Sequence, residues 1–377
     1  MKSIASNILK NTHTHSDLKE LNIYDSSYLL ENIESQIAKI EGGRKAIASK
    51  SFRSARFTLL KELAQGKPLR ILSYEPPAAW NEDGNINKRY QFDVIFAHQY
   101  SEEATTKIIK LGEVDVVYVG SINSQTLYVE NFSSLIFQTL AYHLPVIFDN
   151  TYGPLGAVYQ PLVHHADFVI TDTSKTALNQ YGIGGYIAEG IFRQKPSTDT
   201  TSIFAPSTIE VIKNRRVAID KKILLQDKVN FETRLHKEVA KQKSFSKNAF
   251  TLAKWLNQEE LVMEVNYPGL KTSDSFQNAE NHFNAGYGNV LKFSLWENKF
   301  YFNLLKSFFI AGKPAGLTIS HDNYSYEFEV KIFSDSLTDV LSYLQRVFAL
   351  LKNEKEYRQI LKKQIKLQHA VAQILNS

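Results

Sequence analysis

An aspartate and a lysine follow two apolar runs near the middle of the chain. Asp149 closes the run 145–149, and Lys175 comes shortly after the run 167–172. Ligands bind mainly parallel sheets beyond the carboxyl ends of their strands, which is where these two residues would lie. There a lysine that burial keeps neutral can attack a carbonyl carbon, and a carboxylate can hold or move a proton. An aspartate at a strand end and a lysine after a serine are, by themselves, common surface residues.

The segments around these two residues alternate between apolar runs and helical stretches. Six runs have the near-continuous hydrophobicity of strands buried on both faces: 68–74, 92–98, 114–120, 145–149, 167–172 and 184–189. Helical spacing is found over 28–41, 52–65, 102–111, 130–143 and 155–164. The first of these helices stops at Gly42-Gly43, a common C-terminal signal. This alternation predicts an α/β domain with a mainly parallel sheet covered on both faces.

The second half of the chain has a different pattern. Residues 193–222 are polar and rich in Pro, Ser and Thr, which is typical of a connection between domains. Helices are predicted over 223–243, over 246–257 and from Ser336 onward, and strands over 290–295 and 326–333. We therefore expect an N-terminal segment with the first helix (1–45), a large domain (46–222), a smaller α+β domain (223–352) and a basic amphipathic helical tail (353–377).

The composition excludes several kinds of protein. The 377 residues include no cysteine, which excludes disulfides, cysteine nucleophiles and thiolate metal sites. We expect no membrane span, because no apolar stretch approaches about 20 residues. The paired histidines at 13 and 15 and at 164 and 165 lack a carboxylate cluster, so we expect no metal site. The net charge of +5 is mild, and the tail's basic residues alternate with apolar ones, which favours protein packing over nucleic-acid binding. Cytoplasm is the expected compartment.

Three blocks of sequence resemble a known family. They are 33–49 (IESQIAKIEGGRKAIAS), 143–175 with 181–190 (YGIGGYIAEG), and 265–270 (VNYPGL) with 287–293 (YGNVLKF). In this order and spacing they are similar to the cystathionine synthases, cystathionine lyases and O-acetylhomoserine sulfhydrylases, which are pyridoxal 5'-phosphate (PLP) enzymes of cysteine and methionine metabolism. The resemblance covers roughly residues 20–350. It implies fold-type I, like that of aspartate aminotransferase, with a mainly parallel large domain and a smaller α+β C-terminal domain.

The resemblance implies roles for the aspartate and the lysine. Lys175 would hold PLP as a Schiff base and then move protons, and Asp149 would pair with the pyridine nitrogen. A carboxylate at that nitrogen keeps it protonated, so that the ring can accept electrons from a carbanion on the substrate.

The expected phosphate site departs from the family pattern. The resemblance places the phosphate at the start of the helix after the first strand and beside the lysine, on Ser51, Phe52, Arg53 and Ser174. Phe52 stands where the family has a glycine, and Asp172 stands where it has a hydroxyl. The family's cross-subunit Tyr-x-Arg has no arginine here, in 22–30. Arg53 and Arg56 are either new phosphate ligands or solvated helix charges.

The positions expected to contact the ring face and the substrate are also altered. Trp80 would stack on the pyridine ring, although tryptophan is also a frequent core residue. Asn123 would correspond to a substrate-side asparagine. Glu329 stands where the family has a carboxylate-binding arginine, which leaves Lys331, two residues away on the same strand face, as the candidate cation.

The resemblance implies a PLP-dependent lyase or transferase that acts on an amino acid or a related amine through an external aldimine. The alternative is a catalytically silent homologue that serves as a scaffold or as the partner subunit of an active paralogue, which the altered positions favour. Retention of Asp149 and Lys175 favours the enzyme. The family pattern further implies a homodimer or homotetramer, and a heteromer with a paralogue would supply the missing arginine.

Overall fold

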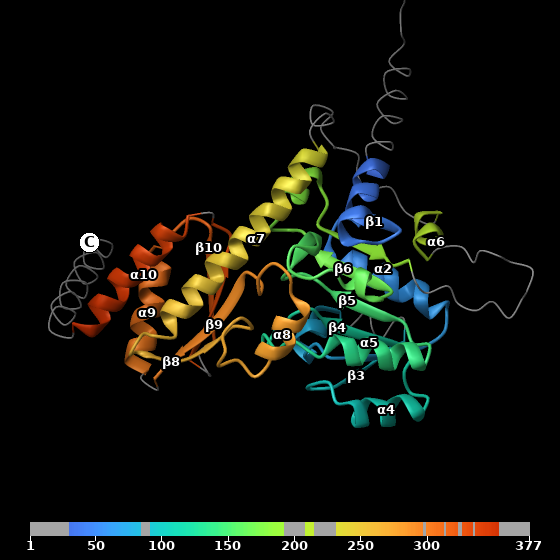
Figure 1. Ribbon diagram of the computed structural model, residues 1–377, viewed down its shortest axis with the longest axis horizontal. Helices are drawn as coiled ribbons and strands as arrows, with labels where there is room; N and C mark the ends of the chain where they lie inside the picture. The colour runs from blue at the N-terminus through green and yellow to red at the C-terminus, as the bar shows by residue number, and fades with distance from the viewer. Residues whose placement is uncertain are drawn as a thin grey trace, which may run out of the picture. The chain divides into compact units, whose positions relative to one another are not determined.

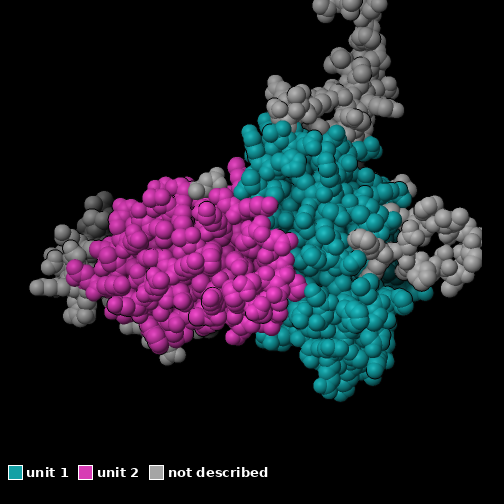
Figure 2. Space-filling view, in the orientation of Figure 1, with its two compact units in different colours: residues 1–125, 129–240 teal, residues 126–128, 241–377 magenta. Residues whose placement is uncertain are grey.

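The computed structural model describes residues 30–83, 91–191, 208–214, 231–296, 299–312, 314–322, 326–334 and 336–353. The chain divides into two units, residues 1–125 with 129–240, and residues 126–128 with 241–377 (Figure 2). The boundary expected between residues 222 and 223, the tail expected beyond Asn353 and the segment 22–29 lie outside the described residues.

The first unit is built on a seven-stranded sheet (Figure 1). Its strands are β1 (Lys45–Ser49), β2 (Leu69–Ser73), β3 (Phe92–Phe96), β4 (Val116–Gly120), β5 (Val146–Asp149), β6 (Phe168–Asp172) and β7 (Gly185–Glu189), in the spatial order β1-β7-β6-β5-β4-β2-β3. The neighbours from β3 to β6 are parallel, and β7 is antiparallel to both β6 and β1. The mainly parallel sheet that the apolar runs predicted is therefore confirmed.

Helices cover both faces of this sheet. On one face, Ala55 and Leu59 of α2 (Phe52–Ala64) belong to the same buried cluster as Ile147 of β5. On the other face, Phe132 of α5 (Phe132–Ala141) meets Phe148 edge-on, with ring centroids 5.0 Å apart. The other helices that the structure describes in this unit are 30–41, α4 (Glu102–Lys110), α6 (Thr208–Asn214), the N-terminal part of α7 (Phe231–Leu256) and the 3-10 turns η1 (Pro77–Asp83), η2 (Pro154–Gly156), η3 (Pro161–His164) and η4 (Ala177–Tyr181).

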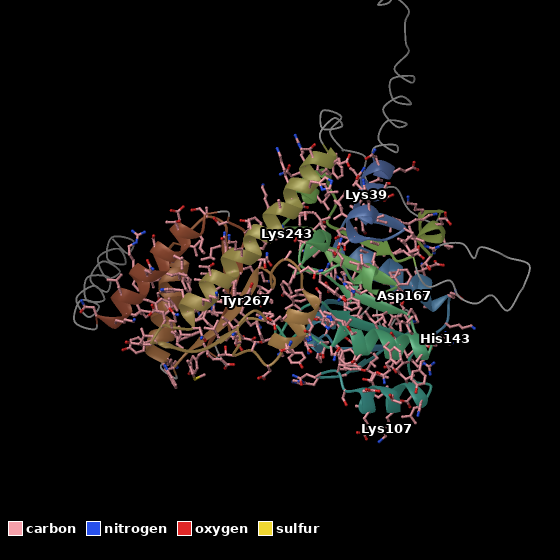
Figure 3. The ribbon with its side chains drawn as sticks, viewed as in Figure 1. Lys39, Lys107, His143, Asp167, Lys243 and Tyr267 are labelled. Carbon is pink, nitrogen blue, oxygen red and sulfur yellow. The ribbon has the colours of Figure 1, made fainter. Side chains whose placement is uncertain are left out.

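The α-helix predicted over 155–164 is wrong. The segment forms two separate 3-10 turns, η2 and η3, and Leu155 lies in the left-handed region with φ of 60°. Pro161 cannot donate a helical hydrogen bond and disfavours the α conformation in the residue before it. The apolar spacing reflects burial of a loop instead, since Leu155 and Leu162 are both buried. Beside this loop, Asp167 (labelled in Figure 3) accepts a hydrogen bond from the Val146 amide at 2.7 Å and secures the start of β5.

The second unit contains a four-stranded antiparallel sheet in the order β10-β11-β9-β8. Its strands are β8 (Val262–Asn266), β9 (Val290–Leu295), β10 (Leu317–Asp322) and β11 (Glu327–Ile332), and its helices are α8 (Phe276–His282), α9 (Lys299–Ala311), α10 (Leu337–Lys352) and the C-terminal part of α7 (Phe231–Leu256). The hydroxyl of Tyr267 (labelled in Figure 3) donates to the carbonyls of Ser246 and Gly288 at 3.1 and 2.9 Å, deep in this core.

Within the described residues, one long helix, α7, takes the place of the two helices predicted over 223–243 and 246–257, and residues 223–230 lie outside the described part of the chain. The break was expected at residues 244 and 245. Directly after it, Ser246 is fully buried within the helix, and its hydroxyl accepts the Tyr287 amide at 2.8 Å. A Cβ on Gly286 would lie 2.1 Å from this hydroxyl oxygen, so serine and glycine together allow a close approach. Every helix within the described ranges is too short or too polar to span a lipid bilayer.

Candidate active site

Asp149 ends β5 with its carboxylate held by three hydrogen bonds. The Tyr118 hydroxyl donates to Oδ2 at 3.0 Å, and the amide and hydroxyl of Thr151 donate to Oδ1 at 3.1 and 2.6 Å. Burial raises the pKa of Asp149, while these hydrogen bonds and the positive charge of Arg56 act in the opposite direction. The carboxylate is thus fixed in orientation at the carboxyl end of a central strand, and the residue is partly exposed.

The segment that carries Lys175 is linked to the Asp149 site. The Thr151 hydroxyl that donates to Asp149 also accepts the amide of Asp172 at 3.2 Å, and the Asp172 carboxylate accepts the amide of Ser174 at 2.8 Å. Ser174 and Lys175 are exposed in the turn after β6. Because β5 and β6 are parallel neighbours, Asp149 and this turn lie at the same edge of the sheet.

Two glycines bring the start of α2 to the same edge. Ser49 and Asp172 both pair with Gly185, from the two sides of β7. A Cβ on Gly184 would lie 2.2 Å from the Lys50 carbonyl oxygen, and one on Gly185 would lie 2.7 Å from the Phe52 Cα. Only glycine therefore allows the turn before α2 to pack this closely, and the helix N-terminus and the turn after β6 lie on either side of β7.

The N-terminus of α2 is built as a capped helix start. The hydroxyl of Ser51 accepts the amide of Ser54 at 3.1 Å, Phe52 is the first helical residue, and Arg53 is exposed. Phe52 needs no left-handed conformation here, so the family's glycine is not required for the helix to begin. Exposed N–H groups at a helix N-terminus bind anions, and the nearby guanidinium of Arg53 adds positive charge.

Trp80 and Arg56 form a buried pair beside Asp149. Trp80 is 3% exposed, donates its indole N–H to the Ser73 hydroxyl at 3.1 Å and packs edge-on against Tyr118 with centroids 4.9 Å apart. The guanidinium carbon of Arg56 lies 4.7 Å from the Trp80 ring centroid, and Nη1 donates to the Ala79 carbonyl at 3.1 Å. Arg56 is therefore no solvated helix charge, since it is 5% exposed. The stacking of Trp80 on a cofactor ring stays a prediction.

Sequence reasoning missed Glu75, which follows β2 and is 3% exposed. Both of its carboxylate oxygens accept the Ser124 amide, at 3.1 and 3.3 Å. The side chain lies over Gly120, where a Cβ would be 2.1 Å from Oε1, and Gly120 pairs with Asp149 in the sheet. Burial, and secondarily the charge of Asp149, raise the pKa of Glu75 to about 8. The available signal was a glutamate directly after an apolar run.

Asn123 lies near this carboxylate, and its side chain is hydrogen-bonded to the backbone. It is 7% exposed, its side-chain amide donates to the Tyr74 carbonyl at 2.7 Å, and its side-chain oxygen accepts the Gln125 amide at 3.0 Å. These bonds connect the loop after β4 to the end of β2. A role in binding substrate stays a prediction.

Lys331 lies in the second unit, on β11. Its ammonium group is 3.1 Å from the Glu329 carboxylate, and the ammonium of Lys292 on β9 is 3.8 Å from the same carboxylate and 3.4 Å from that of Glu327. Glu329 and Lys292 are direct partners in the sheet. Glu329, the acidic residue expected at the position of the family's arginine, is thus paired with lysines.

The sequence matches one family model, that of the Cys/Met metabolism PLP-dependent enzymes, over residues 25–193 and 238–312. Among curated proteins it is similar to the homocysteine/cysteine synthase of Saccharomyces cerevisiae, with 26% identity over 70% of this chain and 64% of that protein. It is also similar to the homocysteine synthase of Schizosaccharomyces pombe, with 27% identity over 69% of this chain and 65% of that protein. The chain thus spans just under two thirds of the length of these relatives.

Two solved structures have the same fold. A putative O-acetylhomoserine (thiol)-lyase from Campylobacter jejuni, which contains N'-pyridoxyl-lysine-5'-monophosphate, has a TM-score of 0.68 at 16% identity, over 85% of each chain. A cystathionine gamma-lyase from Lactobacillus plantarum, complexed with L-serine, has a TM-score of 0.64 at 16% identity, over 84% of this chain and 85% of that one. The expected fold-type I class, family and cofactor are confirmed.

Proposed function

Since the chain belongs to the Cys/Met metabolism PLP-dependent enzymes, we propose that it is a PLP-dependent lyase or transferase that acts on an amino acid or a related amine. One observation carries the proposal. Asp149 and the turn with Lys175 follow neighbouring parallel strands and are joined through the single hydroxyl of Thr151. A carboxylate and a lysine at the same edge of the sheet are the two groups that the cofactor requires.

The residues of the first unit fit the cofactor. PLP, when bound, supplies an electron-accepting ring that stabilises negative charge on the substrate. Asp149 would hold the proton of the ring nitrogen, and Tyr118 and Thr151 keep its carboxylate oriented. The start of α2, with Ser51, would bind the phosphate, and Arg53 and Ser174 would add donors from either side of β7. Lys175 would bind the aldehyde carbon and move protons at its Nζ atom.

The substrate side supports an amine or an unusual amino acid. In the second unit the Glu329 carboxylate forms ion pairs with Lys331 and Lys292. If Lys331 binds the substrate, a substrate carboxylate has to displace Glu329 from it, whereas an amine without a carboxylate does not. The same pairing is the observation that favours the rival function, a catalytically silent homologue acting as a scaffold or as a partner subunit.

Labelling of the lysine tests the proposed function. The purified protein would be incubated with PLP and reduced with borohydride, and the attached pyridoxyl group would be located by peptide mass spectrometry. We expect the label on Lys175, and its loss in Lys175→Ala, because borohydride fixes only a lysine bonded to the aldehyde. The control is Lys107→Ala, which removes a lysine of α4 and should leave the labelling unchanged.

Two outcomes would contradict the proposal. Labelling spread over surface lysines, unchanged in Lys175→Ala, would show non-specific reaction with the aldehyde. Absence of any label at saturating PLP would favour the scaffold or partner-subunit function. If Lys175 is labelled, matched pairs of amines and amino acids added to the PLP-bound protein would then separate the two substrate classes by their effect on its visible spectrum.

A further inference from the structure

Glu75 is a buried carboxyl group that the proposed function leaves unused. It lies beside Asp149, because its Oε1 fills the space over Gly120, the residue that pairs with Asp149 in the sheet. The amide of Ser124 donates to both oxygens and fixes the carboxyl group in this place. At 3% exposure it has almost no access to water that could stabilise a charge.

Among the residues that the structure describes, three ionisable groups interact electrostatically with Glu75. They are Asp149 at the end of β5, the phenol of Tyr118 on β4 and the guanidinium of Arg56 on α2. Arg56 is 5% exposed and Tyr118 is fully buried. The cluster therefore holds one permanent positive charge, two carboxyl groups and one neutral phenol. Glu75, Arg56 and Tyr118 are buried, and Asp149 is partly exposed.

Charge balance decides how many protons this cluster holds. A buried net charge is costly, so one guanidinium favours one ionised carboxylate and one protonated carboxyl group. Burial raises the pKa of both carboxyl groups, that of Glu75 to about 8. Asp149 receives three hydrogen bonds that stabilise its charged form, whereas Glu75 accepts only the amide of Ser124. At neutral pH the proton therefore resides on Glu75 and the negative charge on Asp149.

We propose that Glu75 is a positioning residue for the cofactor, which releases its proton to solvent when a cationic pyridine ring binds at Asp149. The O–H bond of Glu75 breaks and its carboxylate keeps the electron pair. The two carboxylates then balance the protonated ring nitrogen and Arg56. This inference rests on the proposed function, because it takes Asp149 as the partner of the ring nitrogen. It adds a second acidic residue, and a coupled proton, to the cofactor site.

Calorimetry with pyridoxine 5'-phosphate tests the proposal. This ligand has the ring and phosphate of PLP, and its ring nitrogen is protonated at neutral pH, but it lacks the aldehyde and forms no bond to Lys175. Titrations in two buffers of different ionisation enthalpy give the number of protons released per ligand bound. We expect the wild type to release about one proton more than Glu75→Gln. The phosphate contributes equally to both proteins, so the difference isolates Glu75.

The matched control is Glu130→Gln. Glu130 is also 3% exposed, has a pKa raised by burial to about 7 and accepts one backbone amide, that of Tyr100 at 2.9 Å. It is outside the cluster, so this variant should release as many protons as the wild type. Equal release from the wild type and Glu75→Gln overturns the inference and leaves the proposed function intact. A wild type that does not bind the ligand overturns the inference, and the borohydride labelling of Lys175 then decides the proposed function separately.

A second measurement needs no variant. Glutamine is close in shape to the protonated glutamate, so Glu75→Gln should fold. If it does not, the infrared difference spectrum of the wild type with and without ligand tests the inference. The inference requires that ligand binding remove the C=O stretching band of a protonated carboxyl group. A spectrum without that loss overturns it.

Discussion

At the scale of single residues, Gly120 gives Glu75 its place. A Cβ added at Gly120 would lie 2.1 Å from Glu75 Oε1 and 2.9 Å from the Ile122 carbonyl oxygen. We expect Gly120→Ala to lower the free energy of unfolding by about 1–3 kcal/mol, because the side chain and the loop must both move. Urea unfolding followed by circular dichroism measures this change.

Gly312→Ala is the matched control for that substitution. A Cβ at Gly312 would meet no atom of the described residues within 4 Å. Its effect should stay within about 0.5 kcal/mol. If Gly120→Ala were no more destabilising than Gly312→Ala, the result would contradict the close contact between Gly120 and Glu75.

The residues of the candidate site differ in how far the sequence reveals them. The places of Asp149 and Lys175 could be predicted, because Asp149 closes one apolar run and Lys175 comes shortly after another, and both runs form strands. Glu75 could not, because its burial depends on a missing side chain at Gly120 and on the amide of Ser124, both distant in sequence. Arg56 had a weak signal, since it comes three residues before the buried Leu59 and so shares its helix face.

At the scale of elements, the cap of α2 separates a structural role from a binding role. Ser51→Ala removes the hydroxyl that accepts the Ser54 amide, and we expect a loss of about 1 kcal/mol in unfolding free energy. If the start of α2 binds phosphate, the dissociation constant of PLP should also rise, because Ser51 is one of the proposed ligands. Fluorescence titration with PLP measures the second effect.

Ser101→Ala provides the comparison, because Ser101 caps α4 in the same way and accepts the Ala104 amide. It should reduce stability by a similar amount and leave the affinity for PLP unchanged. Equal effects of both variants on PLP affinity would argue against a phosphate site at α2.

The elements of the first unit were largely predictable, because six of its seven strands coincide with short apolar runs, while β1 was expected only from the family resemblance. The pattern failed where apolar spacing had another cause. Residues 155–164 are apolar because the loop is buried, and Pro161 prevents an α-helix there. In α7 the break expected at residues 244 and 245 does not occur, and next to it Ser246 packs against Gly286 and Tyr287 within the continuous helix.

At the scale of the whole molecule, buried carboxyl groups determine how stability depends on pH. Burial raises the pKa of Glu41 and of Glu130 to about 7 and that of Glu75 to about 8, from an unperturbed 4.5. A carboxyl group whose pKa is higher in the folded state than in the unfolded state adds to the free energy of unfolding. This addition is fully present at a pH below the unfolded-state pKa, and it is lost as the pH rises through the folded-state pKa. Stability should therefore fall between about pH 5 and 8, on the order of 3 kcal/mol per group.

Urea unfolding at several pH values across this interval measures the trend. Each Glu→Gln variant should reduce the fall in unfolding free energy with pH by the contribution of that glutamate, since glutamine does not titrate. Asp115, whose pKa is lowered by Arg70, acts only at more acidic pH and does not mask the effect. A stability that rises from pH 5 to 8 would mean that these carboxyl groups ionise freely in the folded protein.

The contact between Gly120 and Glu75 also constrains evolution. A side chain at position 120 and a carboxyl group over it cannot occupy the same space, so mutation at either position alters selection at the other. Among relatives of this chain, a glutamate equivalent to Glu75 should occur together with a glycine equivalent to Gly120. This combination of a glutamate and a glycine, some 45 positions apart in the sequence, would then identify the lineage that acquired a second acidic group beside Asp149.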